Sequence, residues 1–208
     1  MRLAILGASG HGKVVADTAV LAGWSDVVFF DDAWPEVTWN GIWPVVGSTR
    51  DLISQRRDFD GVVVGIGNNL TRAVLQRKLI DAELNIVSVC HPSAVISTHA
   101  NVGSGVVVFA NAVINAFAQV GAGSIINTGA VVEHDCSIGD FCHLSPNAVL
   151  AGGVSTGFQV WVGAGASIKQ LINLGNEVTV GMGSVVLRDV PEGQTVAGIP
   201  AGPILSQD

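Results

Sequence analysis

Charged residues are scarce in this chain of 208 residues, and basic residues are the scarcest. Lysine and arginine together number 10, against 17 aspartates and glutamates, so the formal net charge is −7. The basic residues form no cluster along the chain. Nucleic acids and anionic membranes attract proteins through such clusters, so neither is expected as a partner. A small metabolite is the better candidate for a ligand.

Long apolar runs are also absent, because no stretch approaches the ~18 apolar residues of a membrane-spanning helix. The first residues enter a strand pattern directly, without the charged segment and cleavage site of a secretory signal. These two observations predict a cytoplasmic protein.

The sequence has three cysteines, Cys90, Cys136 and Cys142, and their spacing matches no metal-binding motif. The last two occupy small inward positions of the repeat described below, so we expect them to be core residues. A zinc site would need three imidazoles, and only His134 and His143 lie well inside that repeat. We therefore expect no metal.

Glycine, in contrast, is abundant, with 26 residues, and part of it follows a repeat of six residues. Between Ile96 and Val186, every sixth position is aliphatic except Thr156. Residues two positions before these aliphatics are mostly small. Every third aliphatic position is followed by glycine, which gives a longer period of eighteen: Gly103, Gly121, Gly139, Gly157 and Gly175.

A period of six matches a parallel β-helix in which each coil has three short sides. One coil then takes eighteen residues, and its aliphatic side chains point inward and stack on those of the next coil. The length of the repeat predicts about five coils. The low charge and high glycine content also suggest that other subunits cover the coil walls, so we expect an oligomer.

The first ninety residues alternate between strand and helix patterns. Strands are expected at 2–6, 27–30, 45–46, 61–64 and 86–89, and helices at 13–22, 50–58 and 70–82. This order predicts a small parallel α/β layer. His91 and Pro92 mark a boundary, so we predict an α/β domain at 1–90 and a β-helical domain at 91–208.

Three loops of the α/β domain follow strands and should converge at one edge of the sheet. They are the glycine-rich turn at 7–12, the pair Asp31-Asp32 and a second glycine-rich turn at 65–69. Backbone amides in such turns bind phosphate groups. The glycine spacing differs from that of dinucleotide-binding motifs, so a mononucleotide or a nucleotide sugar fits better.

The repeat itself contains one stretch suited to acid–base chemistry. By register, His134 and Asp135 lie at an outer corner, and an imidazole beside a carboxylate is suited to a general base. A solvated pair without function is the alternative. His143 is also expected to face outward. Gly152 follows His134 by eighteen residues, which places its amide one coil further on, where it could stabilise an oxyanion.

The whole chain resembles the family of sugar acetyltransferases typified by sialic acid O-acetyltransferase and the bacillosamine-pathway N-acetyltransferases. The matching motifs are Gly7-Ala-Ser-Gly-His-Gly12, Asp31-Asp32, Ile66-Gly-Asn-Asn69, Glu133-His134-Asp135, His143 and Val196-Ala-Gly-Ile-Pro-Ala201. The resemblance implies a small Rossmann-like α/β domain followed by a left-handed parallel β-helix. It also implies a homotrimer that binds acetyl-CoA in a groove between coils.

The resemblance further implies a role for individual residues. His134 matches the general base and Asp135 its acidic partner, while Glu133 is the other carboxylate that could orient the ring. Residues that match the sugar-nucleotide site or lie in its motifs are Gly10, His11, Gly12, Asp31, Asp32 and Asn68. Candidate acetyl-CoA contacts are Asn127, His143, Gly152, Gly163, Gly181 and Gly198.

The activity that we predict is transfer of an acetyl group from acetyl-CoA to the amine of a nucleotide-linked amino sugar. The first choice of acceptor is UDP-4-amino-4,6-dideoxy-N-acetylglucosamine, in bacterial glycan biosynthesis of the bacillosamine type. The alternatives are O-acetylation of sialic acid, N-acetylation of GDP-perosamine, and a non-catalytic trimer that binds a sugar nucleotide. The sequence leaves open UDP or GDP as the carrier and an amine or a hydroxyl as the acceptor.

Overall fold

The computed structural model describes residues 1–204, which form two compact units that meet between Pro92 and Ser93. The first unit contains a parallel sheet. Its central strand β1 (Arg2–Leu6) pairs with β2 (Asp26–Phe30) on one side and with β5 (Gly61–Val64) on the other. Single bridges at Val45, beyond β2, and at Ile86, beyond β5, extend the sheet. This order confirms the predicted Rossmann-like layer.

Three helices accompany the sheet: α1 (Gly10–Leu21), α2 (Thr49–Ser54) and α3 (Asn69–Asp81). The remaining strands of the unit are β3 (Trp39–Asn40), β4 (Trp43–Pro44) and β6 (Val89–Cys90). Some predicted bounds were wrong. Helix α1 begins at Gly10, so the glycine-rich turn is shorter than expected, and the predicted strands at 45–46 and 86–89 are mainly single bridges.

Buried aliphatic and aromatic side chains form the core of the first unit. Strands β1, β2 and β5 contribute residues such as Leu6, Phe30 and Val64, which pack against Leu52 of α2 and Leu79 of α3. Near-continuous apolar runs of this kind are typical of parallel strands that are covered on both faces.

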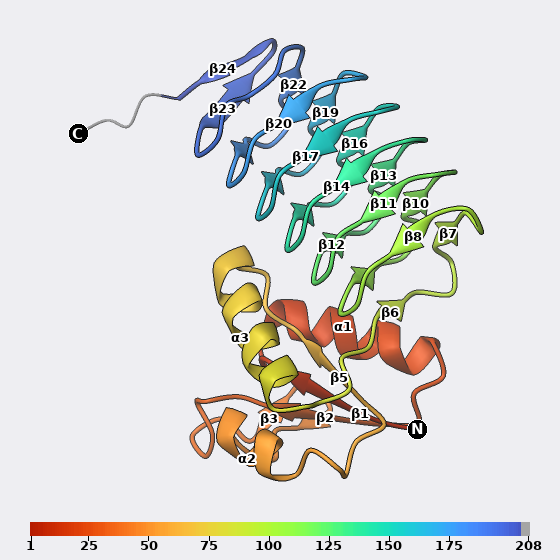
Figure 1. Ribbon diagram of the computed structural model, residues 1–208. Helices are drawn as coiled ribbons and strands as arrows, with labels where there is room; N and C mark the ends of the chain where they lie inside the picture. The colour runs from red at the N-terminus through yellow and green to blue at the C-terminus, as the bar shows by residue number, and fades with distance from the viewer. Residues whose placement is uncertain (205–208) are drawn as a thin grey trace. The chain divides into compact units, whose positions relative to one another are not determined.

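The second unit is a three-sided prism whose coils stack one after another (Figure 1). The valine face consists of β7 (Val95–Ile96), β10 (Val113–Ile114), β13 (Val131–Val132), β16 (Val149–Leu150), β19 (Ser167–Ile168) and β22 (Val185–Val186). The polar face consists of β8 (Asn101–Val102), β11 (Gln119–Val120), β14 (Ser137–Ile138), β17 (Ser155–Thr156) and β20 (Asn173–Leu174). The tryptophan face includes β9 (Val107–Val108), β12 (Ile125–Ile126), β15 (His143–Leu144), β18 (Trp161–Val162), β21 (Thr179–Val180), β23 (Thr195–Gly198) and β24 (Ala201–Pro203).

Strand register confirms the period of eighteen, because Val131 pairs with Val113 before it and with Val149 after it. The second residue of each strand points inward, and most of these side chains are fully buried, including Ile126, Val132 and Leu144. Six strands line the valine face, so the prism has about six coils and the predicted count of about five was too low.

The recurrent glycines lie where the polar face turns into the tryptophan face. A Cβ atom at Gly121 would lie 2.5 Å from the carbonyl carbon of Gly139, and a Cβ atom at Gly139 would overlap the carbonyl oxygen of Gly157. Successive coils therefore approach too closely at this edge for any side chain, which explains the glycine at every eighteenth residue.

Candidate active site

His134 lies at the turn after β13, where the register placed it, and it forms a close pair with the next residue. Its Nδ1 atom is 2.8 Å from Oδ2 of Asp135. A carboxylate only accepts hydrogen bonds, so Nδ1 donates and Nε2 is the nitrogen that can take a proton. Glu133 instead accepts a bond of 3.3 Å from the backbone N–H of His134. The geometry therefore makes Asp135 the residue that orients the ring.

The same contact affects how the ring titrates. The hydrogen bond that His134 donates to Asp135 raises the pKa of His134 above its usual 6.5. Desolvation opposes this effect, and the charges of Asp135 and Glu133 add to it. Both side chains of the pair are 63% exposed. The imidazole is thus accessible to a reactant and its basicity is raised by a neighbouring carboxylate, which suits a general base.

Gly152 lies against the reactive side of this ring. A Cβ atom at Gly152 would lie 2.5 Å from Nε2 and 2.6 Å from Cε1 of His134. At the next residue, the N–H of Gly153 donates to the carbonyl of His134 over 2.9 Å, which links the two coils at this position. Gly152 therefore leaves room for the imidazole in addition to offering a backbone amide beside it.

His143 lies on a different side of the prism, at an outward position of β15. The residue faces outward as expected, but it is only 8% exposed because a neighbouring side chain covers it. The ring stacks on Trp161 at 5.3 Å between centroids, and its Nε2 is 3.1 Å from Nδ2 of Asn127. An amide nitrogen donates, so Nε2 of His143 accepts in this arrangement. The sequence placed His143 and Asn127 in the same site, and the structure brings them into contact.

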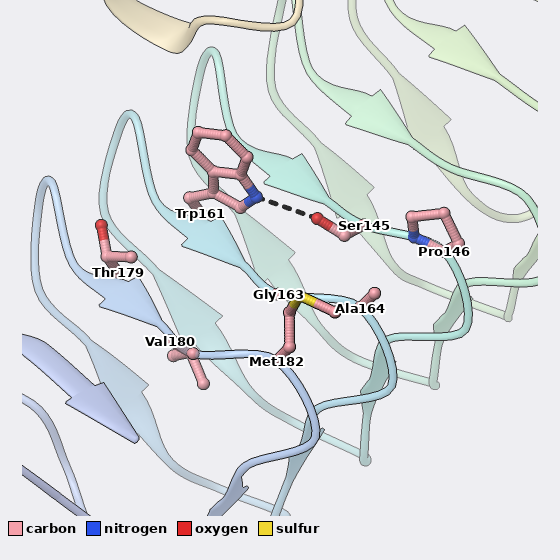
Figure 2. A pocket seen from close by; sticks show the side chains of 9 residues that line it. Ser145, Pro146, Trp161, Gly163, Ala164, Thr179, Val180 and Met182 are labelled. Atoms are coloured by element: carbon pink, nitrogen blue, oxygen red, sulfur yellow. Dashed lines mark hydrogen bonds between the residues drawn. The ribbon is translucent and has the colours of Figure 1, made fainter. Parts of the chain in front are cut away.

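A pocket of about 330 Å³ lies beside this pair (Figure 2). Trp161 forms part of its wall, and the indole N–H donates to Oγ of Ser145 over 2.9 Å. The other lining residues are Pro146, Gly163, Ala164, Thr179, Val180, Gly181 and Met182. Gly163 and Gly181, two of the predicted acetyl-CoA contacts, thus lie together in a largely apolar depression.

The candidate residues of the prism occupy two edges. We define the His134 edge as the turns after the valine-face strands, at 133–136, 151–154, 169–172 and 187–189. The pocket edge comprises the turns after the tryptophan-face strands, at 127–129, 145–147, 163–165 and 181–183. Gly198, at the end of β23, donates its N–H to Ser184 and lies near this second edge. The full width of the valine face separates the two edges.

In the first unit, three predicted substrate residues bind backbone atoms. The carboxylate of Asp31 accepts from the N–H of Ala8 over 2.7 Å and of Ala33 over 2.9 Å. Asp32 accepts from the N–H of Thr49, the first residue of α2, over 2.8 Å. Asn68 caps α3. These side chains hold the loops in place, and the sequence alone gave no indication of that.

His11 and the glycines around it lie in the first turn of α1. Burial, and to a lesser degree the charge of Arg72, lower the pKa of His11 to about 4, so this imidazole is neutral at pH 7. A Cβ atom at Gly12 would overlap the carbonyl oxygen of Gly7, whereas Gly10 faces open space. Only a residue without a side chain allows α1 to start so close to the end of β1.

Arg72 is a residue that sequence reasoning missed. Its side chain is 1% exposed, and the guanidinium donates to the carbonyls of Ile66 and Gly67 and to Oδ1 of Asn69. It thereby fixes the second glycine-rich loop. The only signal in the sequence is an arginine at a position of α3 that faces the core.

Residues 1–204 contain no candidate for a metal site or for a membrane-spanning helix. No group of three or more His, Cys, Asp or Glu side chains there is arranged to hold a metal ion. Within the same residues, no helix has the length and apolar character needed to cross a membrane.

Comparison with known proteins relates both units to sugar acetyltransferases. Residues 2–79 match the PglD N-terminal domain, and residues 117–152 match the bacterial transferase hexapeptide of six repeats. Perosamine N-acetyltransferase from Caulobacter crescentus, solved with CoA and GDP-perosamine, is 38% identical over 99% of this chain and 98% of that one, with a TM-score of 0.94. The acetyltransferase domain of PglB from Neisseria gonorrhoeae, solved with acetyl coenzyme A, is also 38% identical, over 98% of both chains, with a TM-score of 0.93.

The chain belongs to the family of hexapeptide-repeat sugar N-acetyltransferases. This confirms both the resemblance inferred from the motifs and the left-handed β-helix that it implied. A curated member, UDP-N-acetylbacillosamine N-acetyltransferase from Bacillus subtilis, is 39% identical over 113 residues, which is 52% of this chain and about half (51%) of that protein. Acetyl-CoA is the acyl donor in this family. The names of these relatives include a UDP-linked and a GDP-linked sugar, which leaves the acceptor of this chain to be proposed.

Proposed function

We propose that this chain transfers the acetyl group of acetyl-CoA to the amine of a nucleotide-linked 4-amino-4,6-dideoxy sugar. The single observation that carries the proposal is the exposed His134–Asp135 pair with Gly152 against Nε2, on a chain of this family. UDP-4-amino-4,6-dideoxy-N-acetylglucosamine is the first candidate acceptor, and GDP-perosamine is the second. The first unit is the candidate sugar-nucleotide domain, because its two glycine-rich turns and Asp31-Asp32 follow the carboxyl ends of adjacent parallel strands.

The chemistry follows from the orientation of His134. The sugar amine attacks the thioester carbonyl as Nε2 accepts its proton, which forms the N–C bond and an oxyanion. The amide of Gly152 is the candidate donor to that oxyanion. The C–S bond then breaks, and the proton on His134 passes to the departing thiolate. Asp135 stabilises the imidazolium that forms in between.

A homotrimer is part of the proposal. The outward residues of the valine face are Val95, Val113, Val131, Val149 and Val185, with Ser167 as the exception, whereas the polar face presents Asn, Gln and Ser. From the sequence alone, Phe109, Phe117 and Trp161 are all expected to face outward. Phe117 and Trp161 remain 63% and 41% exposed, but Phe109 is buried. Contact with another copy would cover these apolar side chains.

The trimer would also solve a geometric problem. The His134 edge and the pocket edge lie on opposite sides of the valine face, so one prism alone cannot close both around a single acetyl-CoA molecule. Light scattering at micromolar concentration tests the assembly, and a monodisperse monomer would contradict it. Because acetyl-CoA and nucleotide sugars are intracellular metabolites, we also propose that the enzyme acts in the cytoplasm.

The activity itself is tested by incubating purified protein with acetyl-CoA and a panel of UDP- and GDP-linked amino sugars. Release of free thiol reports turnover, and the mass of the product distinguishes an amide from an ester after treatment with hydroxylamine. If no acceptor in the panel leads to release of thiol, the proposal is refuted, and a protein that only binds a sugar nucleotide is favoured. Turnover with hydroxyl acceptors alone would instead favour O-acetylation.

A further inference from the structure

An exposed aromatic pair lies on the His134 edge, on the N-terminal side of the candidate base. In this direction the edge continues in the turns at 97–100 and 115–118. Phe117 is 63% exposed, and its ring stacks on that of His99 with 5.6 Å between the centroids and 22° between the planes. The pair therefore presents a flat apolar surface to whatever lies against this edge.

Neither the turn nor the core accounts for a phenylalanine at this position. Phe117 has a φ of 63°, in the left-handed region that favours glycine, asparagine and aspartate. The equivalent residues of the next two coils are Asp135 and Gly153, with φ of 59° and 69°, which suit such a turn. Because the ring is also mostly exposed, a substrate or another subunit has to account for it.

Phe117 lies one coil before the His134–Asp135 pair. The N–H of Asp135 donates to the carbonyl of Ala116 over 3.1 Å, so the two turns are in direct contact. His99 stacks on Phe117 from the preceding coil, which leaves open the ring face that looks toward His134 and Asp135. Ala116 precedes His134 by eighteen residues and adds only a methyl group between the phenyl ring and the imidazole.

The acceptor sugar can reach from the base to this ring. Gly152, the candidate oxyanion donor, lies one coil after His134, so the thioester belongs on that side and the body of the sugar extends to the other. Nε2 lies beside Gly152, and the coil of Phe117 is two coils before it, roughly 10 Å away.

The dimensions of a 4-amino-4,6-dideoxy sugar match this separation. Its amine nitrogen lies roughly 3 Å from Nε2 when it gives up its proton. The methyl group at C6 is three bonds from that nitrogen, roughly 3–4 Å away. An apolar contact between this methyl group and the phenyl ring spans roughly 4 Å more. The C6 methyl group is therefore the part of the acceptor that can meet Phe117 while the amine is at the base.

We propose that Phe117, stacked on His99, packs against the C6 methyl group of the acceptor and selects 6-deoxy sugars over sugars with a hydroxyl at C6. A hydroxyl group against the phenyl ring would lose its water without gaining a hydrogen-bond partner from that ring. The inference rests on the proposed acetyl transfer and adds to it the residue that determines which hexose is accepted. In the proposed trimer a second copy closes this edge, so the ring would line an enclosed site.

The test compares two acceptors that differ only at C6, a nucleotide-linked 4-amino-4,6-dideoxyhexose and the matching 4-amino-4-deoxyhexose. Wild-type protein should prefer the first by about 10- to 100-fold in kcat/KM, the range in which an apolar contact rejects an added hydroxyl group. Phe117→Asn should abolish most of this preference and keep the fold, because asparagine suits the left-handed turn. Phe141→Asn is the matched control, a phenylalanine with φ of 56° in a turn after the polar face, and should keep the preference.

The outcomes separate this inference from the proposed function. Equal use of both acceptors by the wild type, or an unchanged preference in Phe117→Asn, would overturn the role of Phe117 while acetyl transfer stands. Equal losses with both acceptors and a smaller mass in light scattering would make Phe117 a subunit contact and also overturn it. If the wild type turns over neither acceptor, acetyl transfer is refuted. Calorimetric titration with the two acceptors then decides about Phe117, since equal affinities in the wild type would overturn its role as well.

Discussion

Replacing Gly152 with alanine should impair catalysis without unfolding the protein. The added methyl group would lie 2.5 Å from Nε2 of His134, well inside ordinary van der Waals contact. The imidazole is exposed, so it can swing away at little cost in stability. The backbone does not oppose the change either, because Gly152 is not among the glycines with positive φ. The ring must move by about 1 Å, and a displacement of that size at a catalytic group costs about 10²-fold in rate.

Steady-state kinetics and a thermal melt measure the two halves of this prediction. Gly152→Ala should lower kcat about a hundredfold and keep the melting temperature of the wild type. Gly202→Ala is the matched control, since a Cβ atom there has no atom within 4 Å and its φ is also not positive. It should have wild-type kinetics.

A double mutant separates the position of the ring from the backbone amide of Gly152. If the methyl group acts only by displacing the imidazole, Gly152→Ala should cause no further loss in a His134→Ala background, which itself should lose about 10²–10⁴ in kcat. An additional loss in that background would show that the amide contributes independently. A fully active Gly152→Ala variant would refute the inference that Nε2 must stay where the structure has it.

Three further predictions follow from the hydrogen bonds and titrating groups. Asp135→Asn should move the acid limb of kcat/KM to lower pH, because Asp135 raises the pKa of His134 and only the neutral ring accepts a proton; an unmoved limb would contradict this. Asp32→Asn keeps an acceptor for Thr49 but removes the charge, so it should raise the KM for the sugar nucleotide and leave that for acetyl-CoA unchanged; equal changes in both would be inconsistent with a separate sugar-nucleotide domain. The folded protein holds the pKa of His11 at about 4, so the unfolded chain binds a proton first as the pH falls from 6.5 toward 4. The first unit should therefore lose stability over this pH range. The loss is at most about 3 kcal/mol, and denaturant titrations at pH 7 and pH 4.5 should show it in the wild type and less of it in His11→Gln.

The repeat made the prism predictable because its side chains alternate strictly between inside and outside. Once the aliphatic positions were aligned, the outward corner of His134 and the place of Gly152 one coil later followed directly. The burial of His143 did not follow, because it depends on stacking with Trp161, a contact between neighbouring coils that alternation does not specify. Position in a repeat thus predicts direction but not accessibility.

The loops of the first unit were less predictable for a related reason. Glycine spacing and acidic residues after strands correctly located a cluster of loops, yet the same carboxylates serve the backbone, as Asp31 does for Ala8. A sequence motif does not distinguish a carboxylate that binds a ligand from one that supports the ligand's loop. The buried guanidinium of Arg72 shows the same limit, since its backbone acceptors in the glycine-rich loop exist only once the loop has folded.

The exposure of the His134–Asp135 pair has a consequence for how the site works. Amide formation benefits when water is kept from the thioester and when the oxyanion meets fixed dipoles, yet both side chains of the pair are 63% exposed. One prism has the candidate base on its His134 edge, but the apolar pocket with Gly163 and Gly181 lies on its other edge. A second copy that packs against the valine face would bring its own pocket edge to the first copy's His134 edge and cover the reacting atoms. The proposed trimer would thus account both for the apolar valine face and for the division of the candidate site over two edges.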